Sequence, residues 1–494
     1  MPQKGLQGRK LNLLSGKRVS QIHEASLRIL NEVGVLVADE HFRSRLAQAG
    51  AVTDETARIV RLPQRVVESL LSHAPSEFVL AGRNSEHDLR LGNRRVHLGT
   101  GGAAVRVLDL DDGTLRPSLL SDQYALARLT ENLENVHFFQ CPVVCSDVPK
   151  EIVSVNSFYA ALAGTTKNVQ EAATDPEAVS AVVEMASLIA GGLEALQARP
   201  FISFVASVMI SPLRLDCGVA QCLERMLEAQ IPVALSSAPV TGLSAPATLA
   251  GLLTLAHAEQ LFAICLSQAI APGSRVLYGV VPGVANMWNM GFLGGAIEAG
   301  MMNAAAVLLA RHVGVPIYSD AGGADAKAPD IQAGYEKAFS ILQVALSGGD
   351  YIHHSAGMLD SLMTVAYEQF VIDNDINGMA TRVLEGIKVN DDTLAFDVIR
   401  EVGPGGMFLT QEHTRKYARS SEFYVPNGPN RRSPGSDDDA TDLRQHARRV
   451  ARQLLDREEA APIPPDVDDE VRKRFDIRLP KPDQRSPRRN QMSR

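Results

Sequence analysis

Short apolar runs alternate with longer segments of helical periodicity through the middle of this chain. Each run is rich in β-branched and aromatic residues, and in the segment that follows it apolar residues recur at three- and four-residue spacing. This alternation predicts parallel strands joined by crossover helices. Eight strands are expected, at Val96–Gly99, Val136–Val144, Lys167–Gln170, Phe201–Val208, Pro232–Ser236, Arg275–Val281, Pro316–Ser319 and Tyr351–His354.

Eight successive strand and helix units favour an α/β fold in which the sheet closes into a (β/α)8 TIM barrel, rather than an open doubly wound sheet. The loops at the C-terminal ends of the strands of such a barrel share one face, so functional residues are expected there. The helices are expected near Asp122–Glu134, Lys150–Ala163, Pro176–Ala190, Leu215–Ala229, Pro246–Ala271, Leu293–His312, Ile331–Ser347 and Leu359–Ile387.

The alternation of predicted strands and helices is confined to residues 96–388, which divides the chain into three regions. Residues 1–95 are expected to form an N-terminal cap of short helices, with a hairpin over Phe78–Leu91. The first barrel unit contains a second expected hairpin over Val105–Leu115. Residues 389–494 are expected to be a helical extension with a linker and a disordered tail.

Composition and charge exclude several classes of protein. The 494 residues are 45% hydrophobic and 21% charged, which is ordinary for a soluble enzyme, and the net charge of −8 argues against a nucleic-acid partner. The first ten residues lack the apolar core of a secretory signal. Apolar stretches such as Ala245–Ala258 are interrupted by polar residues and are expected to be too short to span a membrane. A cytoplasmic protein is expected.

The five cysteines are an odd number, scattered in apolar surroundings, and are expected to be buried reduced thiols. Cys141 and Cys145 lie four residues apart, but no second pair of zinc-type spacing follows them. No metal site is expected from this pattern.

Aromatic residues make up only 5% of the chain, so their positions are informative. Trp288 is the sole tryptophan and follows the sixth predicted strand. Its indole either packs under the cap or lines a ligand site, where its face would attract a cation. Tyr278 and Phe204 lie in other strands and could complete an aromatic cage. Gly101 follows the first strand, in a loop that makes a tight turn or lines the pocket.

Charged residues gather after the seventh predicted strand, between Asp320 and Asp330. Asp330 is expected to cap the next helix. Asp325 and Lys327 would form a structural ion pair or take part in chemistry. A lysine at a strand end can form a Schiff base, but Lys327 lies about eight residues beyond its strand, too far for the usual aldolase arrangement.

His353 and His354 end the eighth predicted strand. Side chains alternate across a strand, so one ring is expected to enter the barrel and the other to face the helices.

Three segments of the chain resemble the trimethylamine methyltransferase family. They are D-A-K-A-P-D-I-Q-A-G-Y-E at Asp325–Glu336, H-S-A-G-M-L-D at His354–Asp360 and Y-E-Q-F-V-I-D at Tyr367–Asp373, and the resemblance extends over nearly the whole chain. Members of the family move a methyl group from a methylated amine to a corrinoid protein. Archaeal members that use trimethylamine carry pyrrolysine. This chain contains only standard residues, so it is similar to the branch without pyrrolysine, which includes enzymes that demethylate glycine betaine.

The resemblance implies a methyltransferase that moves a methyl group from a quaternary amine, such as a betaine, to the Co(I) of cobalamin. A partner corrinoid protein would supply that cofactor, with none bound tightly here, and a homo-oligomer is expected. A quaternary ammonium leaves as a neutral amine, so the reaction needs no general acid. The site needs an aromatic or apolar pocket, one anchor for the other end of the substrate, and an open path for the cobalt. The residues expected to bind the substrate are Trp288, Tyr278, Phe204, Asp320 and Gly101. The catalytic residues would be His354 as anchor, with Asp325 and Lys327 organising the mouth.

Two other functions agree with the same residues. One is a barrel lyase or aldolase that uses Lys327, and the other is a barrel that binds a small molecule without catalysis.

Overall fold

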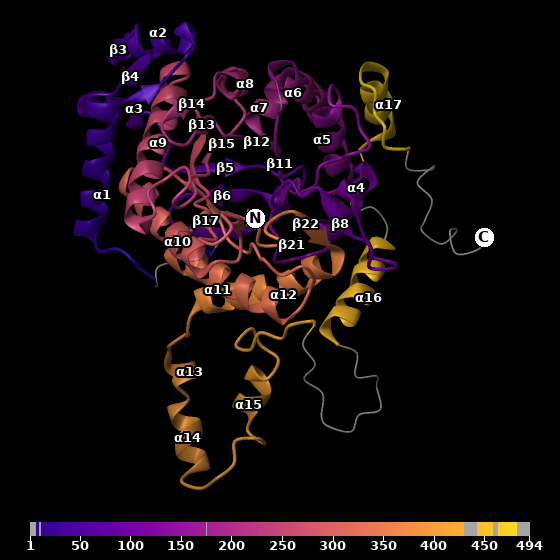
Figure 1. Ribbon diagram of the computed structural model, residues 1–494. Coiled ribbons are helices and arrows are strands. Elements are labelled where there is room, and N and C mark those ends of the chain that lie inside the picture. The colour runs from indigo at the N-terminus through magenta and orange to yellow at the C-terminus, as the bar shows by residue number, and fades with distance from the viewer. Residues whose placement is uncertain (1–5, 9–10, 174, 429–441, 458–462, 482–494) are drawn as a thin grey trace.

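Eight parallel strands form a closed ring in this computed structural model, which describes residues 6–8, 11–173, 175–428, 442–457 and 463–481 (Figure 1). The (β/α)8 barrel predicted from the sequence is therefore confirmed. In the order of their hydrogen-bonded neighbours, the strands are β7 (Arg95–Leu98), β20 (Tyr351–His353), β19 (Ile317–Asp320), β16 (Val276–Val280), β15 (Val233–Ser237), β12 (Ile202–Ala206), β11 (Val169–Ala172) and β10 (Phe139–Gln140).

The main helices surround this ring. They are α4 (Leu120–Glu131), α5 (Val153–Gly164), α6 (Pro176–Ala190), α8 (Cys217–Glu228), α9 (Leu249–Ile270), α10 (Ile297–His312), α11 (Ile331–Ser347) and α12 (Tyr367–Glu385), with the short α7 (Leu193–Ala198) after α6. The last helix begins later than predicted, because β21 (Met358–Leu359) and β22 (Thr364–Ala366) form a hairpin before it. β22 also pairs with β8 (Arg106–Leu108), which forms the predicted hairpin with β9 (Leu115–Pro117).

A β-hairpin closes the N-terminal end of the barrel. Its strands, β5 (Phe78–Leu80) and β6 (Leu89–Leu91), cross the centre of the ring in Figure 1 and confirm the predicted pairing. Their apolar side chains share a cluster with inward-facing residues of the barrel, namely Phe138, Ala234, Leu277, Tyr318 and Tyr351. Backbone hydrogen bonds from Ala81 to Pro200 and from Arg83 to Thr166 place the hairpin at the start of β12 and β11. Access to the interior is therefore from the opposite, C-terminal end.

The ring closes between β7 and β10 through a short seam. A parallel bridge pairs Gly99 with Phe138, and a Cβ on Gly99 would lie 2.3 Å from the Phe138 ring. The His137 amide donates to the Leu98 carbonyl at 2.7 Å, and its Nδ1 accepts from the Leu98 amide at 2.9 Å. Burial holds the pKa of His137 well below its usual value, so the ring is neutral and Nδ1 can accept.

The N-terminal segment packs on α9 as a small subdomain. It contains α1 (Gly16–Arg28), a π-helix at Ile29–Val33, α2 (Glu40–Gln48) and α3 (Gln64–Leu71). Its sheet joins β2 (Val35–Leu36), β3 (Val52–Asp54) and β4 (Ile59–Arg61) to β13 (Met209–Ile210) and β14 (Arg214–Leu215), and β1 (Leu6–Gln7) pairs with β7.

Helix α9 is long and apolar, and it lies within the predicted helix Pro246–Ala271. Its 22 residues meet the length and hydropathy of a membrane-spanning helix, so the expectation that no segment is long enough was wrong. However, 78% of its apolar window is buried inside the protein. That burial, between the N-terminal segment and the barrel, identifies α9 as a core helix.

The chain beyond α12 first extends away from the barrel and then returns. Helices α13 (Asp391–Leu394), α14 (Phe396–Val402) and α15 (Glu412–Tyr417) form an arm below α11 and α12 in Figure 1. Helices α16 (Leu443–Leu455) and α17 (Pro465–Arg474) pack back on the barrel. Glu368, which is fully buried, accepts from Arg448 of α16 at 2.8 Å. Most of the predicted linker and the predicted tail lie outside the described residues.

We expect the buried His97 of β7 to make stability depend on pH. Burial lowers its pKa from 6.5 to about 4. Between these two values the unfolded chain binds a proton that the folded chain does not, so the folded state loses stability as pH falls. The His97→Gln variant lacks this titration. Its free energy of unfolding should therefore increase by about 3 kcal/mol relative to that of the wild type between pH 7 and pH 4. Urea unfolding at each pH measures this, and a constant difference would contradict it.

Candidate active site

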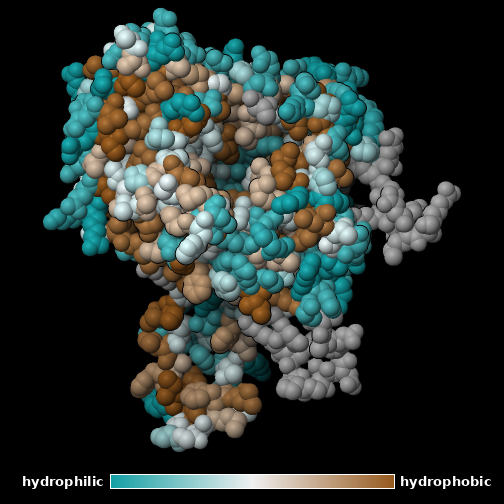
Figure 2. All heavy atoms as spheres, in the orientation of Figure 1, coloured by the Kyte–Doolittle hydropathy of each residue, from teal (hydrophilic) through white to brown (hydrophobic). Residues whose placement is uncertain are grey.

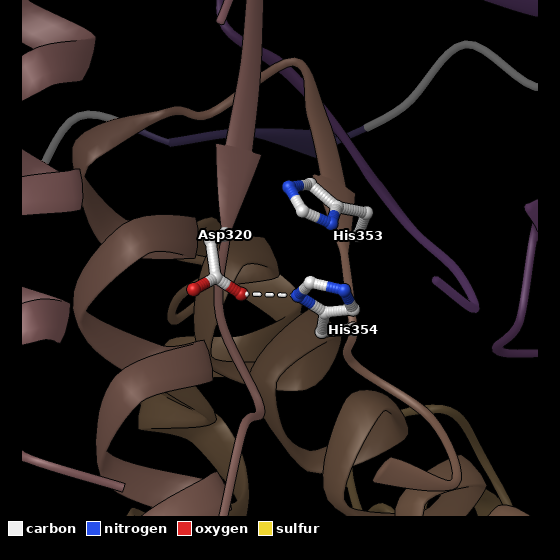
Figure 3. A group of neighbouring side chains, drawn as sticks. All are labelled: Asp320, His353 and His354. Atoms are coloured by element: carbon white, nitrogen blue, oxygen red, sulfur yellow. Dashed lines mark hydrogen bonds and ion pairs between the residues drawn. The ribbon is translucent and has the colours of Figure 1, made fainter. Parts of the chain in front are cut away.

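Three polar side chains meet where β19 and β20 end, at the C-terminal end of the barrel. Asp320 is the last residue of β19 and pairs in register with His353, the last residue of β20. His354 follows directly, and all three side chains are buried. Figure 3 shows the carboxylate of Asp320 facing the His354 ring, with His353 beside them. Figure 2 shows this face of the molecule hollowed over the middle of the barrel.

The backbone of His354 brings both histidine rings to this site. Its φ of 64° lies in the left-handed region, which interrupts the alternation of the strand. The prediction that one ring would face the helices is therefore wrong. Nδ1 of His354 lies 2.7 Å from Oδ1 of Asp320. Gly101 packs on the same ring, and a Cβ there would lie 2.8 Å from Cδ2 of His354.

His353 lies deeper in the barrel, between two aromatic rings. Its ring stacks on Tyr318 with centroids 3.9 Å apart, and its centroid lies 4.1 Å from that of His354. Neither ring nitrogen has a hydrogen-bond partner among the described residues, and both are buried. Burial, reinforced by His354, holds the pKa of His353 well below its usual value, so the ring is neutral.

The donor set of this cluster suits a divalent transition metal. Asp320, His353 and His354 each offer one ligand atom, and these atoms lie within 4.8 Å of one another. Neutral imidazole nitrogen and carboxylate oxygen are common ligands of zinc and related ions. The sequence pattern predicted no metal site because it considered cysteine spacing and did not anticipate the turn at His354.

A buried ion pair holds the two loops that carry the cluster. Nζ of Lys337 donates to the Gly322 carbonyl at 2.5 Å and lies 3.0 Å from Oδ2 of Asp373. The same carboxylate oxygen accepts from the Gly357 amide at 2.7 Å. Both charged side chains are fully buried, and burial raises the pKa of Asp373. The pair thus joins the loop after β19 to the loop after β20.

Asp325 and Lys327 connect loops at the mouth, but not through each other. Oδ1 of Asp325 accepts from the Gly294 amide at 2.8 Å and from the Ser361 hydroxyl at 2.6 Å. Lys327 pairs with Asp360, and its side chain is 73% exposed. The ion pair between Asp325 and Lys327 considered above is therefore not formed. Asp330 caps α11 as predicted, with its carboxylate accepting from the Ala333 amide at 2.9 Å.

Three predicted aromatic residues do not reach the cluster. The Tyr278 hydroxyl lies 2.9 Å from Nδ1 of His257 on α9, and Phe204 packs edge-on against Phe158 of α5. Both alternate to the outer face of the barrel, so the prediction that they line the pocket was wrong. Trp288 lies at the tip of the hairpin formed by β17 (Val284–Ala285) and β18 (Phe292–Leu293) and is 96% exposed. The structure does not place its indole beside Asp320.

Sequence reasoning missed Lys337 and Asp373 although a signal was present. Lys337 directly follows the segment Asp325–Glu336 and Asp373 ends the segment Tyr367–Asp373, both of which carry the family resemblance. Because each residue lies inside a predicted helix, nothing in the local pattern indicated that the two side chains meet.

Comparisons with known proteins identify relatives over nearly the whole chain. The family described as "Trimethylamine methyltransferase (MTTB)" matches residues 3–479. The chain is 32% identical over 465 residues to the glycine betaine methyltransferase of Desulfitobacterium hafniense, covering 94% of this chain and 95% of that one. It is 33% identical over 415 residues to the trimethylamine methyltransferase of Methanosarcina thermophila, covering 83% and 86% of the two chains.

The monomethylamine methyltransferase of Methanosarcina barkeri has a similar fold. Its solved structure aligns with a TM-score of 0.50 at 13% identity, over 75% of this chain and 79% of that one. At that identity the likeness concerns the fold alone.

A closed barrel with a buried polar cluster at its C-terminal end defines an α/β-barrel enzyme. The match over almost the full length shows which one: the chain belongs to the trimethylamine methyltransferase family. It is therefore a methyltransferase, and a lyase that uses Lys327 is not supported. That lysine is exposed and paired with Asp360, whereas a Schiff-base lysine is typically desolvated or placed next to another cation.

We expect Lys337→Met to destabilise the protein strongly, because it leaves the Asp373 carboxylate buried without its cation. Removing one partner of a buried pair costs about 3–5 kcal/mol of unfolding free energy. The double variant Lys337→Met with Asp373→Asn should recover part of this loss, since a neutral amide can still accept from Gly357. Urea unfolding of the three proteins tests the pair, and equal stability of the single variant and the wild type would contradict its role.

Proposed function

We propose that this protein removes a methyl group from a quaternary amine of the betaine class and passes it to a corrinoid held by a separate protein. The observation that carries the proposal is the similarity to glycine betaine methyltransferase over 94% of the chain. In-line attack on the methyl carbon is the chemistry that a Co(I) corrinoid supplies.

The barrel offers what such a reaction needs from the protein. The N-terminal end is filled by the β5–β6 hairpin, so substrate and corrinoid must share the C-terminal mouth. There the Asp320 carboxylate, held by His354, supplies negative charge to a quaternary ammonium. Gly101 leaves room beside the His354 ring. Asp325 and Lys327 hold the surrounding loops through Ser361 and Asp360.

Exposed apolar side chains at the mouth support the docking of a partner protein. Leu243, Met287 and Trp288 are all exposed, and the last two lie at the tip of the β17–β18 hairpin. Met287 reaches the Gly242 loop, where its Cε would lie 3.7 Å from a Cβ on that glycine. These three residues therefore form an apolar rim, the kind of surface that an interface buries. Trp288 is proposed to meet the corrinoid protein or to cover the bound amine.

The arm formed by α13, α14 and α15 supports a homo-oligomer. None of these helices contains a buried residue, and large apolar side chains such as Phe396, Phe408 and Leu409 are exposed. Figure 2 shows apolar residues gathered on this arm. Short helices without a packed face are marginal in water, so they need permanent cover. A second copy of the chain is the partner that is always present.

The first experiment supplies Co(I) cobalamin with a series of methylated amines and measures the demethylated product by mass spectrometry. We expect the wild type to convert glycine betaine to dimethylglycine. Asp320→Asn should slow product formation about 100-fold, because the substrate cation loses its counter-charge and its position. Asp330→Asn is the matched control, since asparagine also caps a helix. The proposal fails if no quaternary amine is demethylated, and the role of Asp320 fails if both variants are equally active.

The second experiment measures the mass of the protein in solution by light scattering. We expect the wild type to be an oligomer and the double variant Phe396→Ser with Leu409→Ser to dissociate, because the substitutions remove apolar area at the contact. Leu193→Ser is the control, as Leu193 is also exposed but lies on α7, outside the arm. A monomeric wild type, or dissociation of the control alone, would contradict this role of the arm.

A further inference from the structure

We propose that Asp320, His353 and His354 bind a divalent transition-metal ion of the zinc class at the mouth of the barrel. Each residue offers one ligand atom, and the three atoms lie within 4.8 Å of one another. They come from the ends of two adjacent parallel strands, which fix their spacing. The site uses His353, a residue to which the proposed methyl transfer assigns no role.

The environment of His353 is the observation that points to a ligand. Its side chain is 1% exposed, and neither Nδ1 nor Nε2 has a hydrogen-bond partner among the described residues. Leaving a buried donor or acceptor unsatisfied costs about 1–3 kcal/mol. The stacked ring of Tyr318 holds the imidazole in place, so it cannot turn to solvent. A metal ion would satisfy one of the two nitrogens.

The hydrogen bond between Asp320 and His354 does not by itself explain the cluster. It accounts for the 2.7 Å contact between those two residues, but it gives neither ring nitrogen of His353 a hydrogen-bond partner among the residues that the structure describes. It also leaves open why His354 has a left-handed backbone, which brings its ring to 4.1 Å from that of His353. Strained residues of this kind concentrate at functional sites. A shared metal ion would explain the positions of both histidines and of the carboxylate, because all three would be its ligands.

The donor atoms decide which ion fits. Two imidazole nitrogens and one carboxylate are typical of catalytic zinc sites, which keep a position open for water or substrate. Magnesium and calcium prefer oxygen donors alone. In a tetrahedral zinc site the ligand atoms lie about 3.4 Å apart, as follows from bonds of about 2.0–2.1 Å. Small rotations of the three side chains would close the remaining gap.

The ion would also supply a positive charge for the carboxylate of the substrate, an argument that rests on the proposed function. A betaine carries a carboxylate as well as its ammonium group. The cations of the surrounding loops are already paired: Lys327 and Arg106 with Asp360, and Lys337 with Asp373. A metal with an open position would give the substrate carboxylate an electrophilic partner.

The test measures metal binding directly, without methyl transfer. Purified protein is stripped with a chelator and titrated with Zn²⁺ by calorimetry, and with Co²⁺ while its visible absorption is recorded. We expect one ion to bind per chain, with the absorption of a four- or five-coordinate cobalt site. His353→Phe keeps a ring stacked on Tyr318 but removes both nitrogens, and Asp320→Asn removes the charge. Each should weaken binding by more than about 100-fold, since loss of a direct ligand exceeds the effect of a supporting contact.

The control is His97→Gln, because His97 is also a buried barrel histidine, and its Nδ1 has no hydrogen-bond partner in the described part of the chain. It should bind the metal as the wild type does, and circular dichroism should show every variant folded. The proposal is overturned if the wild type binds no ion at one per chain, or if His353→Phe binds as tightly as the control. Demethylation by a protein that binds no ion in these titrations would overturn it while supporting the proposed function. Metal binding without demethylation of any amine would do the reverse.

Discussion

Closure of the strand ring between β7 and β10 is the constraint on which the rest of the structure depends. Gly99 approaches the Phe138 ring so closely that a Cβ would lie within 2.3 Å of it. The neutral ring of His137 replaces part of the missing strand ladder by accepting from the Leu98 amide. Without this seam the sheet would have two open edges, and the strands would not enclose a barrel interior.

The closed ring has two unlike ends. The β5–β6 hairpin fills the N-terminal end with apolar side chains, which pack on Leu277 and Tyr351 inside the barrel. The opposite end carries buried polar groups supported by the pair of Lys337 and Asp373. Such a pair is expensive to desolvate, and its geometry joins two loops that the strands alone would leave independent. The buried ion pair therefore holds the loops at the C-terminal mouth, and apolar packing closes the N-terminal end of the barrel.

Segments outside the barrel cover parts of its surface and leave other apolar side chains exposed. The N-terminal subdomain covers α9, a long apolar helix that is mostly buried inside the protein. After the arm, the chain returns through α16, where Arg448 meets the buried carboxylate of Glu368. Large apolar side chains stay exposed on the arm and on the rim around Trp288. Both are suited to contacts between proteins: the arm to the proposed homo-oligomer, and the rim to the proposed corrinoid protein.

The sequence by itself determined the eight strands, most helix positions, both predicted hairpins and the cap of α11 at Asp330, because hydrophobic period and turn chemistry are local properties. The motifs also indicated the family. Only the tertiary structure decided which side chains share a cavity. Tyr278 and Phe204 turned outward because alternation within a strand sets their direction once its register is known. His353 and His354 came together because one left-handed residue overrides that alternation, and no sequence pattern encodes such a turn at a non-glycine residue.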